Sequence, residues 1–320
     1  MKVLMDVGEI GYPTEYLLSR IRGRRVSLIE DLHVIIISPD ILKQLISSRH
    51  GELTAGSGED GIRRYLLREY RWAYKQMNKE LRSIFTPFFI FFEIRTLIIC
   101  LRYKTIKDGG GAESVLSLSL LSERIRRLLN TGTDMPSVLD EIASALTPSS
   151  PRPSLGQVYL KNGLQGVEEE LYVSFLEHAV RSQLHPVIMK FLRSVVDYRN
   201  IVHTYKQLKW GLRSEPLFVS GGSIKRSRLR KLIHKKELSG IAEIVNKLTG
   251  KTIGEPVGAF LESALKTSLT RKTELMIWDD PEIGLILNYL WRRYIEAENL
   301  NVLFYGRDID RDVIINELIH

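Results

Sequence analysis

The sequence predicts an all-α protein built from repeated helical units, and three observations lead to this prediction. Apolar residues recur at three- and four-residue spacing along most of the 320 residues, which is the period of an amphipathic helix. A helical pattern recurs about every hundred residues, at 91–97, 195–201 and 294–300, and such self-similarity indicates duplicated packing units. One stretch, residues 34–37, resembles a strand, but an isolated β-branched run cannot build a sheet.

The first part of the chain predicts four helices. Residues 13–29 open on a proline, which is favoured in the first turn of a helix. Residues 38–46 place a short apolar helix behind a Ser-Pro-Asp cap. Residues 61–81 have the spacing of a long amphipathic helix, and residues 85–104 carry the first copy of the pattern.

The longest apolar stretch, residues 85–101, has nearly the length of a membrane span. Glu93 and Arg95 interrupt its centre, and charged residues there are costly in a bilayer. We therefore expect a buried helix of a soluble protein.

The same order of a short helix, a longer helix and the repeated pattern follows twice more. Residues 136–146 and 168–184 precede the second copy, and residues 239–248 and 257–276 precede the third. A last short helix is expected over residues 308–319. Internally duplicated helical bundles explain this order better than one continuous core.

Glycine-rich breaks divide the units. The run Gly109-Gly110-Gly111 and the Ser-Gly-Gly-Ser sequence at 220–223 indicate linkers, because glycine destabilises a helix. We therefore predict three helical units over residues 1–108, 109–214 and 215–320.

Composition restricts the partners and the compartment. The net charge of +8 favours acidic partners such as nucleic acid, an anionic lipid surface or an acidic protein, although a solvated basic face is an equally good interpretation. The single cysteine, Cys100, lies in an apolar run and cannot form an intramolecular disulfide, which fits a reducing compartment.

Each copy of the pattern places polar residues in an apolar helix. An acid and an arginine two positions apart point to opposite sides of a helix, whereas Asp197 and Asn200, three apart, share a face. Buried polar groups need partners, so we interpret these residues as structural pins between helices, with a ring of charge facing a partner as the alternative. The pinning residues are Glu93, Arg95, Asp197, Arg199, Asn200, Glu296 and Asn299.

Two basic clusters are candidate partner-binding surfaces. The stronger one lies within residues 225–236, where the cations would surround most of a helix and leave a few apolar residues to pack. No aromatic residues alternate with these charges, which disfavours the stacking of nucleic-acid bases. The candidate partner-binding residues are Lys225, Arg226, Arg228 and Arg230, together with Arg20, Arg22, Arg24 and Arg25.

No motif predicts an enzyme, a metal site or a bound cofactor. The formal Gly-x-Gly-x-x-Gly match at residues 56–61 follows a predicted helix rather than a strand, and Glu59 and Asp60 would repel a pyrophosphate. The seven histidines lack the spacing of metal ligands. We therefore expect no catalytic residues.

Three passages together resemble the C subunit of V-type and A-type rotary ATPases, which is called subunit d in eukaryotic V-ATPases. Residues 16–24 are similar to the family's opening helix. Residues 197–202, Asp-Tyr-Arg-Asn-Ile-Val, are similar to its internal signature. Residues 281–306, with Asn299-Leu300 and the closing Phe-Tyr-Gly, are similar to its final long helix and glycine exit. The signature departs from the family pattern at Thr96 and Glu298.

The resemblance implies a funnel of three similar helical bundles and a mechanical role. Such a subunit sits at the cytoplasmic face of the membrane on the proteolipid ring, receives the central stalk and passes torque during ATP-linked ion transport without binding nucleotide. The alternative from another functional class is a stand-alone basic helical protein that binds nucleic acid through residues 225–236, which would show strongly salt-dependent binding.

Overall fold

The computed structural model describes residues 3–8, 10–29, 58–130, 134–148, 152–211, 216–250, 258–306, 309 and 311–319. Every regular element in these ranges is an α-helix, which confirms the all-α class. The extended segments add one isolated antiparallel bridge, between Leu4 and Leu121. The strand-like run at 34–37, the short helix expected at 38–46 and the start of the glycine motif at 56–57 lie outside the described residues.

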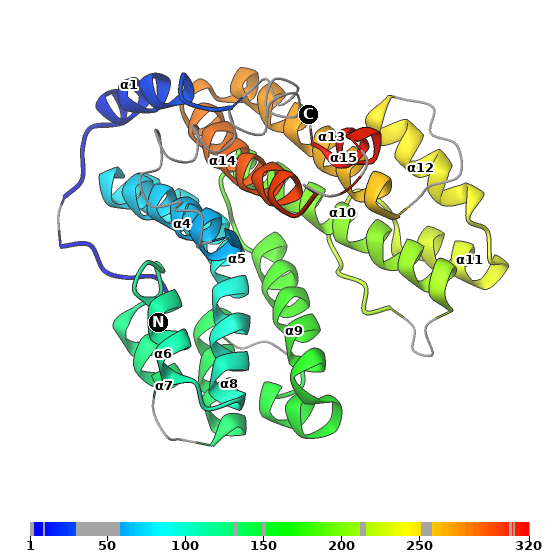
Figure 1. Ribbon diagram of the computed structural model, residues 1–320, viewed down its shortest axis with the longest axis horizontal. Helices are drawn as coiled ribbons and strands as arrows, with labels where there is room; N and C mark the ends of the chain where they lie inside the picture. Colours follow the sequence, from blue (N-terminus) through cyan, green and yellow to red (C-terminus); the bar gives the residue numbers. More distant parts are fainter. Residues whose placement is uncertain are drawn as a thin grey trace. The chain divides into compact units, whose positions relative to one another are not determined.

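The helices of the described residues are labelled in chain order in Figure 1. They are α1 (Thr14–Arg25), α4 (Gly58–Gln76), α5 (Lys79–Thr105), α6 (Gly109–Leu116), α7 (Glu123–Asn130), α8 (Met135–Leu146), α9 (Leu155–Arg181), α10 (Pro186–Trp210), α11 (Arg226–Lys235), α12 (Ser239–Thr249), α13 (Gly258–Asp279), α14 (Pro281–Tyr305) and α15 (Arg311–Glu317).

The chain forms two compact units. One contains Met1–Tyr12, Arg71–Val196 and Leu217–Ser223, and the other contains Pro13–Tyr70, Asp197–Pro216 and Ile224–His320. The three helical units that the sequence predicts, over residues 1–108, 109–214 and 215–320, remain a prediction.

In the first unit, α5 is the central core helix. Its residues Phe85, Phe88 and Phe89 are fully buried, and the rings of Phe88 and Phe191 on α10 lie 5.5 Å apart. The helices α6, α7 and α9 pack against α5, and α8 packs along α9. This aromatic packing contributes more than burial alone, since offset aromatic pairs add about 0.5–1.5 kcal/mol each.

In the second unit, α14 is buried over most of its length and lies alongside α13 (Figure 1). Asp280 caps α14 by accepting hydrogen bonds from the amides of Glu282 and Ile283, and Pro281 occupies the first turn. A side chain at Gly284 would collide with the backbone of Met276, so glycine is required for the two helices to approach.

The helix boundaries differ most from the sequence prediction at two places. The helix expected over 61–81 breaks after Gln76, because the Asn78 side chain accepts a hydrogen bond from the Leu81 amide at 2.9 Å and starts α5 there. The longer helix expected from residue 168 starts at Leu155, where Ser154 caps it, and non-helical backbone at Gly163 marks a kink.

The glycine run expected to be a linker is helical. Gly109 to Gly111 form the first turn of α6, and the Asp108 side chain accepts a hydrogen bond from the Gly111 amide at 2.9 Å. A side chain at Gly111 would collide with the ring of Tyr103. The cap and this close approach outweigh the low helix propensity of glycine.

The helix α5 is long and apolar enough to cross a membrane by length and composition. Most of its apolar window is buried against the rest of the protein, and Glu93 is buried near its middle. Burial of this kind is what a core helix of a folded domain shows.

Candidate functional site

The acidic residue of each repeated pattern binds the backbone of a distant segment. Glu93 on α5 accepts a hydrogen bond from the amide of Leu120 at 2.6 Å. Asp197 on α10 accepts one from Ile224 at 2.9 Å, again 27 residues further along the chain. All three carboxyl groups of the pattern are buried, at 2–4% exposure.

The third copy makes the same contact, but its partner amide precedes the acid in the sequence instead of following it. Glu296 on α14 accepts a hydrogen bond from the amide of Ile29 at 3.0 Å, and Ile29 follows α1. The same chemistry therefore recurs three times, with a helix carboxylate satisfying a loop amide. Each of these side chains is buried and satisfies a backbone amide, so it fixes the loop it binds.

The other residues of the pattern lie in different environments. The Asn299 amide group donates to the carbonyl of Ile319 at 2.8 Å and accepts from its amide at 2.9 Å, which fixes the segment after α15. Asn200 is buried, Arg199 is partly buried and Arg95 is exposed. A pinning role for all seven residues of the pattern stays a prediction.

A buried arginine that the sequence analysis missed lies at the centre of the second unit. Arg293 is 1% exposed, and its Nη1 donates to Glu296 at 2.8 Å and to the Tyr65 hydroxyl at 2.7 Å. Its Nη2 donates to the Arg24 carbonyl at 3.0 Å and to Ser27 at 2.6 Å. One guanidinium thus joins α14 to α4 and to the end of α1.

The surrounding groups keep Arg293 charged. Burial alone would lower its pKa, but Glu296 and the phenols of Tyr65 and Tyr289 raise the pKa above its ordinary value. Burial and the Glu69 carboxylate, against the opposing charge of Arg293, raise the pKa of Tyr289 to about 12. The cluster therefore holds a charged Arg293 beside Glu296, with Tyr65 and Tyr289 neutral at physiological pH.

A second ionic cluster closes a loop of the first unit. Arg152 binds Glu170 at 2.8 Å and Glu177 at 3.1 Å, and Glu177 also accepts hydrogen bonds from the backbone amide and hydroxyl of Ser220. Burial would raise the pKa of Glu177, but the hydrogen bonds from Ser220 and Arg152 lower it overall. Arg152 lies in a Pro-Arg-Pro loop, and the sequence alone did not identify it.

The two sets of basic residues predicted to bind a partner differ in how far they are exposed to solvent. On α1, Arg22 is exposed and Arg20 and Arg25 are partly so, whereas Arg24 binds Glu69 at 2.5 Å. Flanking and within α11, Lys225, Arg226, Arg228 and Arg230 are all exposed. Leu229 and Leu232 are the buried side of α11, so its cations face solvent.

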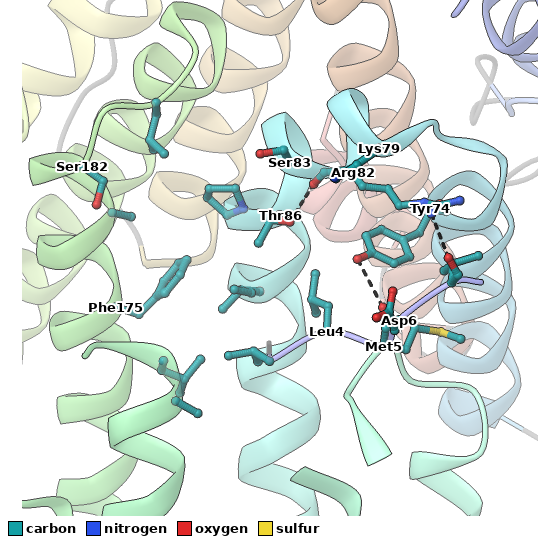
Figure 2. A pocket seen from close by; sticks show the side chains of 18 of the residues that line it. Leu4, Met5, Asp6, Tyr74, Lys79, Arg82, Ser83, Thr86, Phe175 and Ser182 are labelled. Atoms are coloured by element: carbon teal, nitrogen blue, oxygen red, sulfur yellow. Dashed lines mark hydrogen bonds between the residues drawn. The ribbon is translucent and has the colours of Figure 1, made fainter. Parts of the chain in front are cut away.

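A cavity of about 670 Å³ lies in the first unit. It is bounded by the N-terminal segment, the end of α4, the start of α5 and the ends of α8 and α9 (Figure 2). Figure 2 shows Leu4, Thr86 and Phe175 on different sides of it. Most of the lining is apolar, and Lys79, Arg82 and His178 contribute cationic or titratable groups.

The chain matches a known family over most of its length. The profile of the ATP synthase (C/AC39) subunit family matches residues 29–317. The chain belongs to this family. Membership of the ATP synthase (C/AC39) subunit family confirms the resemblance predicted from residues 197–202 and 281–306. A comparison with curated protein sequences found no match.

We expect removal of one of these carboxylates to lower the free energy of unfolding measurably. Asp197→Ala removes the acceptor of the Ile224 amide and should destabilise the protein by about 2 kcal/mol. Asp197→Asn retains an oxygen acceptor and should cost less than about 1 kcal/mol. Urea unfolding followed by circular dichroism measures both, with Arg193→Ala on the exposed face of α10 as the control. Equal losses in the Ala and Asn variants would contradict the hydrogen-bond account.

The Arg293 cluster predicts a strongly non-additive pair of substitutions. Arg293→Met should cost about 3–5 kcal/mol, because it leaves the Glu296 carboxylate buried without its cation. Adding Glu296→Gln removes that charge but keeps an acceptor for Ile29, so the double variant should be more stable than Arg293→Met alone. Denaturant midpoints measure the difference; a double variant as unstable as the sum of both single changes would refute the pairing.

His203 on α10 predicts a loss of stability in acid. Burial, with Arg199 and Lys206 nearby, lowers the pKa of His203 from 6.5 to about 4. The unfolded chain therefore binds this proton first, and the stability contribution is complete above pH 6.5 and declines as the pH falls towards 4. The wild type should lose about 1–2 kcal/mol more than His203→Gln between pH 7.5 and pH 5. Parallel slopes in urea titrations of both proteins would contradict this assignment.

Proposed function

We propose that this protein is the non-catalytic central-stalk subunit of a rotary V/A-type ATPase, and that it couples the membrane proteolipid ring to the rotor shaft during ATP-linked ion transport. Family membership supports the assembly. The observation that carries the mechanical role is the repeated carboxylate-to-loop hydrogen bond at Glu93, Asp197 and Glu296. A subunit that transmits torque must resist deformation, and loops fixed to core helices supply that resistance.

The proposed position is the cytoplasmic face of the membrane, against the ring. The exposed cations of α11 support this, because anionic headgroups attract each Lys or Arg near the surface by about 1 kcal/mol. No acidic residue interrupts residues 225–236, and Glu237 is the first acid after them. Attraction of this kind orients the subunit while the protein contacts with the ring and shaft hold it.

The composition of α11 also determines how the alternative function, nucleic-acid binding, would behave. Leu229 and Leu232 are its buried residues, and α11 contains no Phe, Tyr or Trp that could stack on bases. Nucleic-acid binding through α11 alone would therefore be electrostatic, non-specific and steeply dependent on salt.

Affinity purification of the tagged protein from its native membranes, with mass spectrometry of the proteins recovered, tests the proposed function. Recovery of proteolipid-ring and central-stalk subunits in fixed ratio is the expected result. A tagged variant with Asp197→Ala and Glu93→Ala lacks two of the loop contacts. It should recover less of the shaft, because its scaffold is less stiff. Recovery of nucleic acid and no ATPase subunit would overturn the proposal.

The α11 surface predicts a specific loss of membrane association. Replacing Lys225, Arg226, Arg228 and Arg230 with Ala should weaken flotation with phosphatidylglycerol vesicles by about tenfold or more. The matched control replaces four exposed cations elsewhere, Lys161, Arg193, Lys209 and Lys247, and lowers the net charge equally. Equal weakening by both sets would show that net charge, rather than the α11 surface, determines the association.

A further inference from the structure

The cavity of the first unit has a shape and lining that the proposed coupling role does not use. Its volume of about 670 Å³ lies within the usual range of ligand sites in proteins. Every lining residue belongs to the same compact unit, so the cavity is a property of that unit alone. The apolar lining includes Leu4, Ile90, Leu146, Phe175, Ala179 and Leu184.

One side of the cavity exposes apolar surface to water. Ile10 lines it and is 90% exposed, although isoleucine is among the residues most often buried in folded proteins. Leu184 is only partly buried. An apolar chain lying in the cavity would cover both residues, and burial of such surface favours binding.

Among the described residues of the lining, cations outnumber carboxylates: the charged side chains are Lys79, Arg82 and Asp6. Arg82 is fixed by hydrogen bonds to the carbonyls of Val7, Tyr74 and Lys75. Within the described part of the chain, the Lys79 ammonium and the His178 ring make no hydrogen bond or ion pair, and Lys79 is exposed. Figure 2 shows Lys79 and Arg82 together at the start of α5 and Ser182 across the cavity.

We propose that this cavity binds an anionic amphiphile, with its acyl chain against the apolar lining and its acidic headgroup beside Lys79. The predominantly apolar walls disfavour a purely polar ligand, since a polar group against them would lose its hydrogen bonds to water. The cationic groups select an acidic head over a neutral one. A free fatty acid and an anionic phospholipid share this chemistry, and the experiment distinguishes them. The site goes beyond the coupling role and does not depend on it.

The probes are oleate, measured by calorimetry, and vesicles of phosphatidylglycerol or phosphatidylcholine, measured by flotation. Both are used with the full-length protein. Leu184→Trp adds bulk at the cavity, and its matched control is Leu160→Trp, at a leucine of α9 that is 75% exposed and outside the lining. Lys79→Gln removes the headgroup cation, and its control is Lys161→Gln at an exposed lysine of α9. All four positions are exposed or partly so, and thermal melting verifies that each variant folds.

The expected result is saturable binding of one oleate per chain. Lys79→Gln should weaken it about fivefold, and Leu184→Trp by about tenfold or more, with both controls unchanged. Binding to phosphatidylglycerol vesicles alone, reduced by the same two variants, supports the proposal with phospholipid as the source. No saturable binding to either probe overturns it. Binding that the cavity variants leave unchanged, or that only the α11 substitutions abolish, overturns it as well.

Discussion

The structure depends on buried carboxylates on long helices, each of which accepts a hydrogen bond from the backbone amide of a loop. Glu93, Asp197 and Glu296 each occupy an apolar helix, where an ionised side chain without partners would cost several kcal/mol. The loop amide supplies a partner, and the loop gains a fixed position in return. Because the contact recurs at three places, the course of the connections is set by the long helices rather than by the loops' own sequence.

The third copy shows how this contact extends into a larger cluster. Glu296 binds the Ile29 amide and also the Arg293 guanidinium, which reaches the carbonyl of Arg24 and the hydroxyls of Ser27 and Tyr65. A chain segment near the N-terminus and one near the C-terminus are thereby held through a single charged pair. Breaking such a pair is far more costly than never having formed it, so the cluster favours one arrangement over its alternatives. A scaffold of this kind suits a subunit that transmits force.

The sequence predicted the helical class, because it depends on local periodicity, and the family, because three passages resemble it. The start of α5 could not be predicted, since the apolar spacing continues through Met77 and Leu81 and only the Asn78 cap interrupts it. The helical glycine run depends on the ring of Tyr103. In the candidate site, the apolar surroundings of the acids predicted that these side chains need partners, and their pinning role stays a prediction. Arg293 was missed, although an Arg and a Glu three residues apart in a buried helix were a readable signal. The cavity depends on tertiary packing alone.

The most direct test of this account is amide hydrogen exchange at Leu120, Ile224 and Ile29, the three loop amides bound by helix carboxylates. Loop amides ordinarily exchange by local fluctuation, whereas a pinned amide exchanges only when its core contact opens. The account predicts protection at all three positions comparable to that of the core helices, and loss of protection at Ile224 alone in Asp197→Ala. Rapid exchange at all three amides in the wild-type protein would show that the carboxylates do not hold the loops.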